Sequence, residues 1–492
     1  MPELDSIDPR AAASLLGAEA DFPDRRLFTR LPKLISSLIS RLRAAPSRTT
    51  RAARRGALRW LHNRRLHPRA LLSRVRRQVC LRVPELPVLV VPHDTSEIDK
   101  HGRGAPSDAG PLRSSQARGY LAHFAALATL DGALLGGLDA WAWTRPWTPH
   151  GQHDQGRAML EKESCKWDHG VARAERLLRA AGFQGEIWHP EDREADIFEH
   201  LVHQTRKGRK LVVRADLDGR PRNVLDERPE RTPEQRWRPM EDRLAELSWS
   251  EAEPVQVDSR ATDRARGQVH HIRQAQVAFR FCAVTLKPSK RYEGTAFRQG
   301  LPLWVVEVQE QDPPADVEPL HWLLWSLAPV KVDEDARLVI AVYKVRWKAE
   351  DLLKVCKSAC HLEDQYVSSL TAFKRLLAVV MALATHLTQV VTLAREEPDR
   401  PAKDVVEPAD LQATREAASY YRVPWPRGRV SLGTFLELVA RIGGYEVRKT
   451  RRPGQLVIYR GWTLIQEHQA IAEHARAQAG PRLKKPRNRG IR

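Results

Sequence analysis

The stretch YKVRWKAEDLLKVCK, residues 343–357, is the part of the sequence from which the rest of the chain can be interpreted. Within it, Tyr343, Arg346, Glu350 and Lys357 follow the spacing Y-x2-R-x3-E-x6-K. At about 3.6 residues per turn, these four positions fall close to one stripe of a helix. Such a stripe can hold a metal ion through its carboxylate and phosphate oxygens through its phenol, guanidinium and ammonium groups. The alternative is a solvated helix face with an ion pair one turn apart.

The overall charge points to a polyanionic partner. The 492 residues include 81 Lys and Arg against 61 Asp and Glu, which gives a formal net charge of +20. A charge of this size favours nucleic acid. No apolar run of about 18 residues predicts a membrane span, and we expect the most apolar stretch, residues 376–388, to be a buried core helix.

The cysteines favour a reducing compartment. There are five of them, an odd and small number, and no secretory signal is visible, so we expect reduced thiols and a cytoplasmic, nucleoid-associated protein. Cys356, Cys360 and His361 suggest a zinc site, but no second ligand pair follows at zinc-site spacing. Packed helix thiols are the favoured interpretation.

The N-terminal part of the chain is unusually basic. Residues 25–84 contain 18 Lys or Arg and no Asp or Glu, interleaved with apolar residues at helical spacing. This pattern predicts a small helical module that packs on one side and faces phosphate on the other, and a disordered basic tail is the alternative. Arg59, Arg64 and Arg65 of this module are our candidates for DNA contacts.

Three acids stand out by their positions. Asp94 follows the apolar run VLVV (88–91), Asp192 follows a second short strand that begins near Gly185, and Glu350 lies on the charged helix. Two hard cations roughly 3.5–4 Å apart, held by carboxylates, are well suited to phosphodiester hydrolysis. Spacing alone supports this weakly, because an Asp at a strand end is commonly a cap or turn residue.

Several blocks of the chain resemble the bacterial cut-and-paste DDE transposases of the insertion-sequence-four family, and the transposon-five type in particular. The resemblance runs through most of the chain and is most specific at the Y-R-E-K spacing. The matching blocks are ALRWLHN (57–63), VVPHDTS (90–96), EKESCKW (161–167), EDREADI (191–197), LVVR (211–214), HWLLWSLAPV (321–330), residues 343–357 and ARIGGY (440–445).

This resemblance implies a catalytic triad of Asp94, Asp192 and Glu350 on an RNase H-like fold. Each acid would ligate metal, with two Mg²⁺ ions per active site and Mn²⁺ as a substitute. The family's mechanism would follow: water cuts one strand at the transposon end, the 3′-hydroxyl forms a hairpin on the other strand, water reopens it, and the 3′-hydroxyl joins target DNA. The sequence departs from the family at Glu191, which we expect to add negative charge beside Asp192.

The resemblance also implies DNA contacts. Tyr343, Arg346 and Lys357 would bind phosphate near the cleaved end. Trp322 would stack on an extruded base, although Trp325 competes for that role and a core tryptophan in a strand is the alternative. Arg193 and Arg214 match arginines of two family blocks and would contact the DNA backbone.

The predicted architecture is α/β, with an RNase H-like core interrupted by a β-rich insertion and flanked by helical domains. We expect the following parts: a basic DNA-end-binding domain at 1–84, the first part of the core at 85–205, the insertion at 206–333, the second part of the core with the catalytic Glu helix at 334–395, a linker at 396–410, a helical dimerisation domain at 411–480 and a basic tail at 481–492.

The leading functional hypothesis is a transposase that works as a homodimer on double-stranded DNA, namely inverted repeats and target, without a membrane. Another RNase H-like nuclease is the second hypothesis. A catalytically decayed DNA-binding repressor is the third, and it would predict a lost acid or a truncated N-terminus. The presence of all three acids disfavours it.

Overall fold

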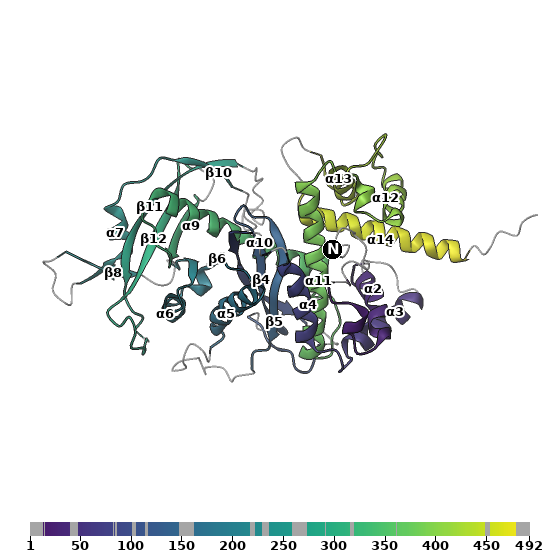
Figure 1. Ribbon diagram of the computed structural model, residues 1–492, viewed down its shortest axis with the longest axis horizontal. Coiled ribbons are helices and arrows are strands. Elements are labelled where there is room, and N and C mark those ends of the chain that lie inside the picture. The colour runs from purple at the N-terminus through teal and green to yellow at the C-terminus, as the bar shows by residue number, and fades with distance from the viewer. Residues whose placement is uncertain are drawn as a thin grey trace, which may run out of the picture.

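The computed structural model describes residues 13, 15–39, 48–81, 83, 86–100, 105–113, 117–146, 162–216, 222–228, 236–257, 273–290, 292–314, 319–360, 362–447 and 453–478. The predicted basic tail at 481–492 and His361 of the zinc alternative lie outside these residues. The fold is mixed α/β. A 13-stranded sheet formed by the described residues has helices on both faces (Figure 1). The predicted α/β class is therefore confirmed.

The central strands are the ones that position the candidate acids. They are β1 (Val88–Val90), β2 (His93–Asp99), β3 (Gly110–Pro111), β4 (Arg118–Ala128), β5 (Leu134–Trp143), β6 (Glu186–Glu191) and β7 (Lys210–Arg214). β1 is parallel to β6 and β6 is parallel to β7, whereas β4 is antiparallel to β1, β2 and β5. β4 and β5 are consecutive in the chain and form an antiparallel hairpin.

The predicted insertion continues the same sheet. It contains β8 (Asn223–Leu225), β9 (Trp237–Pro239), α7 (Met240–Ala245), β10 (Glu253–Val257), β11 (Arg273–Leu286), β12 (Leu301–Gln311) and β13 (His321–Ser326). β13 pairs antiparallel with β7, so the long β11–β12–β13 meander joins directly to the central strands. The short strands of this part are held by pairing: β8 and β10 pair with β11, and β9 pairs with β8.

Helices cover the two faces of the sheet with separate apolar clusters. α5 (Cys165–Ala180), the short 3-10 helix η4 (Arg193–Ala195) and α6 (Phe198–Arg206) pack on one face, with Trp167 and Phe198 in the cluster. α9 (Asp333–Val345) packs on the other face. α10 (Trp347–Lys354) and a π-helical turn, η5 (Val355–Ala359), follow α9 directly.

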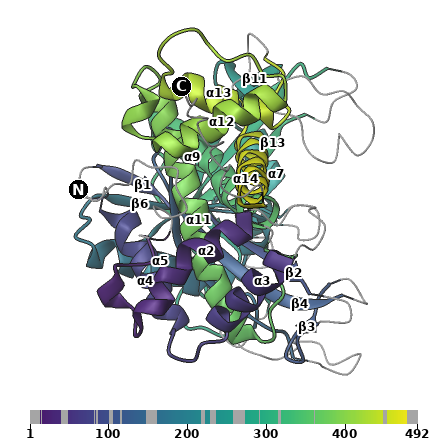
Figure 2. The same ribbon diagram turned by 90° about the vertical axis from the view of Figure 1, so that its right-hand side faces the viewer.

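A long apolar helix, α11 (Leu370–Glu396), connects the sheet to the remaining helices (Figures 1 and 2). By length and composition α11 could cross a membrane, although we expected no apolar run of that length, but 89% of its most apolar window is buried within the protein. The prediction of a core helix here is therefore confirmed.

The flanking helices pack around α11. The predicted basic module is helical where it is described, as η1 (Glu19–Asp21), α2 (Arg25–Ile39), α3 (Arg48–Leu61) and α4 (Pro68–Cys80). The C-terminal part contains η6 (Ala402–Asp404), α12 (Pro408–Tyr420), α13 (Leu432–Ile442) and α14 (Gln455–Gln478). α2, α3 and the C-terminal helices lie on the side of α11 away from the β11–β12 strands (Figure 1). α4 packs between β5 and α11.

Candidate active site

Asp94 and Asp192 lie on two neighbouring segments of the sheet. Asp94 is the second residue of β2, not the residue after a strand that we predicted from VLVV. The reason is Pro92, which has no N–H to donate. Val91 bonds to Trp188 of β6, and the carbonyl of Pro92 accepts from Ala126 of β4, so the chain changes partner there and resumes as a second strand.

Asp192 is the N-cap of η4, directly after β6. Its Oδ1 accepts a hydrogen bond of 2.9 Å from the backbone N–H of Glu194. Asp94 uses one oxygen in the same way, accepting from the N–H of Thr95 at 2.7 Å. Each carboxylate is thus fixed by its own backbone and keeps its second oxygen for other partners.

Glu350 reaches the site from a broken helix. The single helical stripe predicted for residues 343–357 is divided among three segments, because Arg346 lies between α9 and α10 and Lys357 lies in η5. The backbone N–H of Arg346 bonds to the carbonyl of Tyr343, three residues back, which tightens the turn at this point. The Arg346 guanidinium is buried and donates to Glu350 Oε1 at 2.8 Å.

The charges of the three acids act on one another. Burial and the neighbouring charges of Asp192 and Glu350 raise the pKa of Asp94 to about 7, despite opposing contributions from Arg346 and the Thr95 N–H. Burial also raises the pKa of Asp192, and Arg346 opposes that rise. Acids that are 98 (192 minus 94) and 158 (350 minus 192) positions apart in the sequence therefore share one electrostatic environment with a single buried arginine.

This donor set suits a hard divalent cation in its chemistry. All three side chains offer anionic oxygen, and the repulsion that raises the pKa of Asp94 is what a cation between them would relieve. Within the described residues, however, no group of three His, Cys, Asp or Glu side chains already encloses a metal position. Glu350 instead holds Arg346.

Tyr343 and Trp322 pack against each other beside the acids. Their ring centroids are 5.2 Å apart with an interplanar angle of 68°, an edge-to-face contact. Trp322 is only 8% exposed within the apolar cluster under α9, which matches the core-tryptophan alternative. Trp325 faces the opposite side of the sheet, where its Nε1 donates to Asp196 Oδ1 at 3.1 Å. Base stacking by either ring stays a prediction.

Two of the other predicted basic residues adjoin this cluster. Arg214, at the end of β7, hydrogen-bonds Tyr343, which lowers the phenol's pKa against the larger effect of burial, and it also donates to the carbonyl of His321 at 3.1 Å. Lys357 Nζ lies 3.2 Å from Ser96 Oγ and pairs with Glu363 at 2.9 Å. The Y-R-E-K residues are therefore brought to one region even though the helix is broken.

The remaining predicted DNA contacts lie elsewhere. Arg193 is exposed next to Asp192 and lines a small cavity with Arg113 and Lys166. Arg59 lies near the end of α3, and Arg64 and Arg65 lie in the turn that follows it. All three N-terminal arginines are exposed, but α3 lies across α11 from α9, so they are not part of the acid cluster (Figure 1).

A row of buried histidines behind the acids escaped the sequence analysis. His93 Nε2 lies 3.1 Å from His189 Nδ1, and His93 Nδ1 lies 3.3 Å from His123 Nε2. Burial pushes the pKa of both His93 and His123 well below the usual value. The neighbouring histidines add to this effect for His93, and Lys166 and Arg173 add to it for His123. The available signal was one histidine in each of the three strands β2, β4 and β6.

Glu191, which we expected to add negative charge beside Asp192, has a buried histidine as its partner. It is fully buried, and its Oε2 lies 2.7 Å from His200 Nε2. Burial alone would lower the pKa of His200, but Glu191 and Asp168 raise it to about 9. One imidazolium is thus shared by two carboxylates, those of Glu191 and Asp168.

Comparison with known proteins gives only remote similarity. No protein-family model matches the chain. Among solved structures, the chain is similar to the piggyBac transposase in a synaptic complex with hairpin DNA, with a TM-score of 0.38 and 8% identity over 99% of this chain and 84% of that chain. The argument for function therefore rests on the residues of the site.

Proposed function

We propose that the protein is a DDE-type DNA transposase that cuts at transposon ends and joins the freed 3′-hydroxyl groups to target DNA. The observation that supports this most is the association of Asp94, Asp192 and Glu350, from three distant segments, with the buried Arg346. A structural ion pair would need one acid for one arginine. Three acids around one cation leave an excess of negative charge that a catalytic metal site requires.

In this mechanism the side chains of the site hold and orient one phosphodiester. Arg346 and Lys357 supply donors for its non-bridging oxygens, and Arg214 holds the Tyr343 ring against Trp322. Asp94, Asp192 and Glu350 would hold Mg²⁺ or Mn²⁺, which would supply Lewis-acid stabilisation of the charge on the phosphate and lower the pKa of water. Fixing the reacting groups in place removes much of the entropic cost of reaction.

Three finer parts of the proposal come from the family resemblance alone: a hairpin intermediate, base stacking by Trp322, and a homodimer assembled through the C-terminal helices. The exposed arginines of α3 and the following turn would bind the transposon end. α3 and α9 lie on opposite sides of α11 (Figure 1). The proposed DNA site therefore has two separate parts, one at the N-terminal arginines and one at the acids.

The test is cleavage of duplex DNA that carries the inverted repeat flanking the coding sequence, with Mg²⁺ present. Asp94→Asn, Asp192→Asn and Glu350→Gln should each abolish nicking and retain DNA binding. Asp351→Asn is the matched control, because Asp351 lies next to Glu350 on α10 but pairs with Lys348 at 3.5 Å. Full nicking by Glu350→Gln would remove this residue from the site and overturn the proposal.

The same assay separates the two other candidates. Nicking without joining to a target plasmid would identify a nuclease. Specific binding without any metal-dependent nicking by the unaltered protein would identify a DNA-binding repressor.

A further inference from the structure

A second basic site lies away from the acids. A cavity of about 450 Å³ opens between α4, α5, β5 and α11, and none of Asp94, Asp192 and Glu350 lines it. Its volume falls within the range of roughly 300–1,000 Å³ typical of ligand sites. The side chains that line it are those of Pro68, Arg69, Leu72, Arg76, Ala140, Trp141, Ala142, His169, Ala172, Arg173, Arg176, Lys374 and Leu377. We refer to this cavity as the basic cleft.

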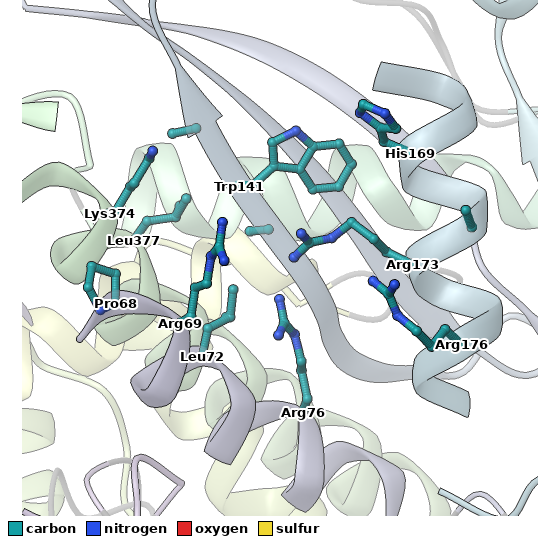
Figure 3. A pocket seen from close by; sticks show the side chains of 13 residues that line it. Pro68, Arg69, Leu72, Arg76, Trp141, His169, Arg173, Arg176, Lys374 and Leu377 are labelled. Carbon is teal, nitrogen blue, oxygen red and sulfur yellow. The ribbon is translucent and has the colours of Figure 1, made fainter. Parts of the chain in front are cut away.

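Three helices direct their cations into this cleft. Arg69 and Arg76 come from one face of α4, Arg173 and Arg176 from one face of α5, and Lys374 from α11. Seven positions separate Arg69 from Arg76, two helical turns, so both point the same way. Figure 3 shows the arginines of α4 and α5 converging on the space over the β5 strand, with the Trp141 ring beside them.

The positive charge of the cleft exceeds what the protein itself neutralises. No Asp or Glu is among the lining residues. The buried Asp139 contacts both Arg76 and Arg173, with 2.6 Å between its Oδ2 and Arg173 Nε, so two guanidinium groups share a single carboxylate. The Nε of Arg76 is buried and finds no hydrogen-bond partner among the described residues.

Two further cations of the cleft, Arg69 and Lys374, act on each other. Burial lowers the pKa of Lys374, and the charge of Arg69 lowers it further. Arg69 and Arg176 are exposed. Like charges held close together across a cavity destabilise the protein until an anion binds between them.

The floor of the cleft is rigid. The Trp141 ring packs on the buried His123 ring with centroids 4.3 Å apart, and the Arg173 guanidinium lies 5.1 Å from the centre of the Trp141 ring. Arg173 is held on two sides, by Trp141 and by Asp139. A preformed site of this kind loses little conformational entropy on binding.

We propose that the basic cleft binds backbone phosphates of duplex DNA outside the segment held at the acid cluster. The shared chemistry is that of a phosphate group, which arginine clusters bind through bidentate hydrogen bonds. The walls come from the N-terminal module, the core and α11, so a bound backbone fastens these three parts to one another. The proposal rests on DNA being the substrate of the proposed function, and its test is independent of cleavage.

The experiment measures binding of a random-sequence linear duplex over a series of salt concentrations. Arg69→Gln/Arg176→Gln removes two exposed cations from the cleft. Arg206→Gln/Lys207→Gln, at the exposed end of α6, removes two exposed cations outside the lining residues, so both variants lower the net charge of +20 by two. Two lost phosphate contacts should lower the slope of log K against log salt by about 1.8.

We expect this change in slope for the cleft variant, with the slope of the control unaltered. Equal slopes for the cleft variant and the unaltered protein would overturn the proposal. Pyrophosphate, added at constant ionic strength, tests for a free phosphate compound as the ligand: binding of pyrophosphate that the cleft variant loses, with no change in DNA slope, would also overturn the DNA assignment. Thermal unfolding monitors the fold of each variant.

Cleavage by the same preparations tells the two proposals apart. Nicking that depends on Glu350, together with an unchanged slope in the cleft variant, would sink the cleft proposal and leave the proposed function standing. A reduced slope in the cleft variant of a protein that never nicks DNA would support the cleft proposal and overturn the proposed function.

Discussion

At the scale of single residues, Arg346 is the cation that interacts with all three candidate acids. Its guanidinium is buried, bonds to Glu350, and lowers the pKa of both Asp94 and Asp192. Neutralising it leaves three acids without their nearby cation and removes a phosphate donor. We therefore expect Arg346→Gln to slow single-turnover nicking by roughly 10²–10³-fold, the usual loss for one preorganised donor.

The matched control for this prediction is Arg337→Gln. Arg337 lies on α9, about two turns before Val345, the last residue of that helix. It pairs with Glu253 at 2.7 Å on the surface. Its loss should leave the nicking rate within about twofold, because a surface pair contributes little free energy. Equal rates for the two variants would mean that Arg346 has only a structural role.

His200 governs a pH-dependent part of the stability. Its folded-state pKa of about 9 lies above its usual value of 6.5, because it is held between Glu191 and Asp168. The imidazolium therefore stabilises the folded protein fully below about pH 6.5, and this contribution is lost as the pH rises through about 9. The difference between the folded-state pKa and the usual pKa of His200 corresponds to at most about 3 kcal/mol in the free energy of unfolding.

Urea unfolding at about pH 6 and about pH 9 measures this contribution. The unaltered protein should lose stability over this interval, and His200→Gln should be less stable at the lower pH and show a smaller change. A variant with the same pH dependence as the unaltered protein would show that other groups cause it.

At the scale of elements, two helical glycines should respond to alanine in opposite ways. A Cβ at Gly170 in α5 would meet His123 Nε2 at 2.8 Å and His93 Nδ1 at 3.0 Å, whereas a Cβ at Gly56 in α3 meets nothing within 4 Å. Gly170→Ala should therefore destabilise by about 1–3 kcal/mol through overpacking. Gly56→Ala should stabilise by about 0.5–1 kcal/mol through helix propensity.

Denaturant unfolding measures the stability of both glycine variants, and each variant serves as the control for the other. If Gly170→Ala is as stable as Gly56→Ala, the histidine row is not packed against α5 as closely as these distances indicate.

The same scale shows where sequence reasoning succeeds and where it stops. The apolar run VLVV predicted β1, and the short strand expected near Gly185 is β6, because each run is a local pattern. The break at Arg346 left no signal, since Val345, Arg346 and Trp347 are all acceptable in a helix. The histidine row was invisible for a different reason: pairs 30 and 96 positions apart meet only through the order of the strands.

At the scale of the whole molecule, one apolar core unites parts that we predicted as separate domains. A single cluster of buried residues extends from Leu15 near the N-terminus, through α11, to Ile465 in α14. The predicted boundaries at residues 84 and 410 therefore divide the sequence without dividing this core. Parts that share a core are expected to unfold together.

Arg375 of α11 connects the basic module to this core. Its side chain is 5% exposed and donates to two backbone carbonyls, those of Leu66 at 2.6 Å and Leu61 at 2.8 Å. Arg375→Met should preserve the apolar stem but leave both carbonyls without these donors, at a cost of about 1–3 kcal/mol for each carbonyl that stays buried. We expect the N-terminal helices to unfold before the rest, which would turn one transition into two.

Hydrogen exchange resolved along the chain tests this separation directly. In Arg375→Met, amides of α3 and α4 should exchange faster while those of α11 and β4 keep their protection. Arg395→Met is the control on the same helix, because Arg395 is exposed and donates to the carbonyl of Pro453. Uniformly faster exchange in every element of Arg375→Met would mean that the module and the core are one cooperative unit. The basic cleft, which α4, α5 and α11 enclose together, would then be as rigid as the sheet itself.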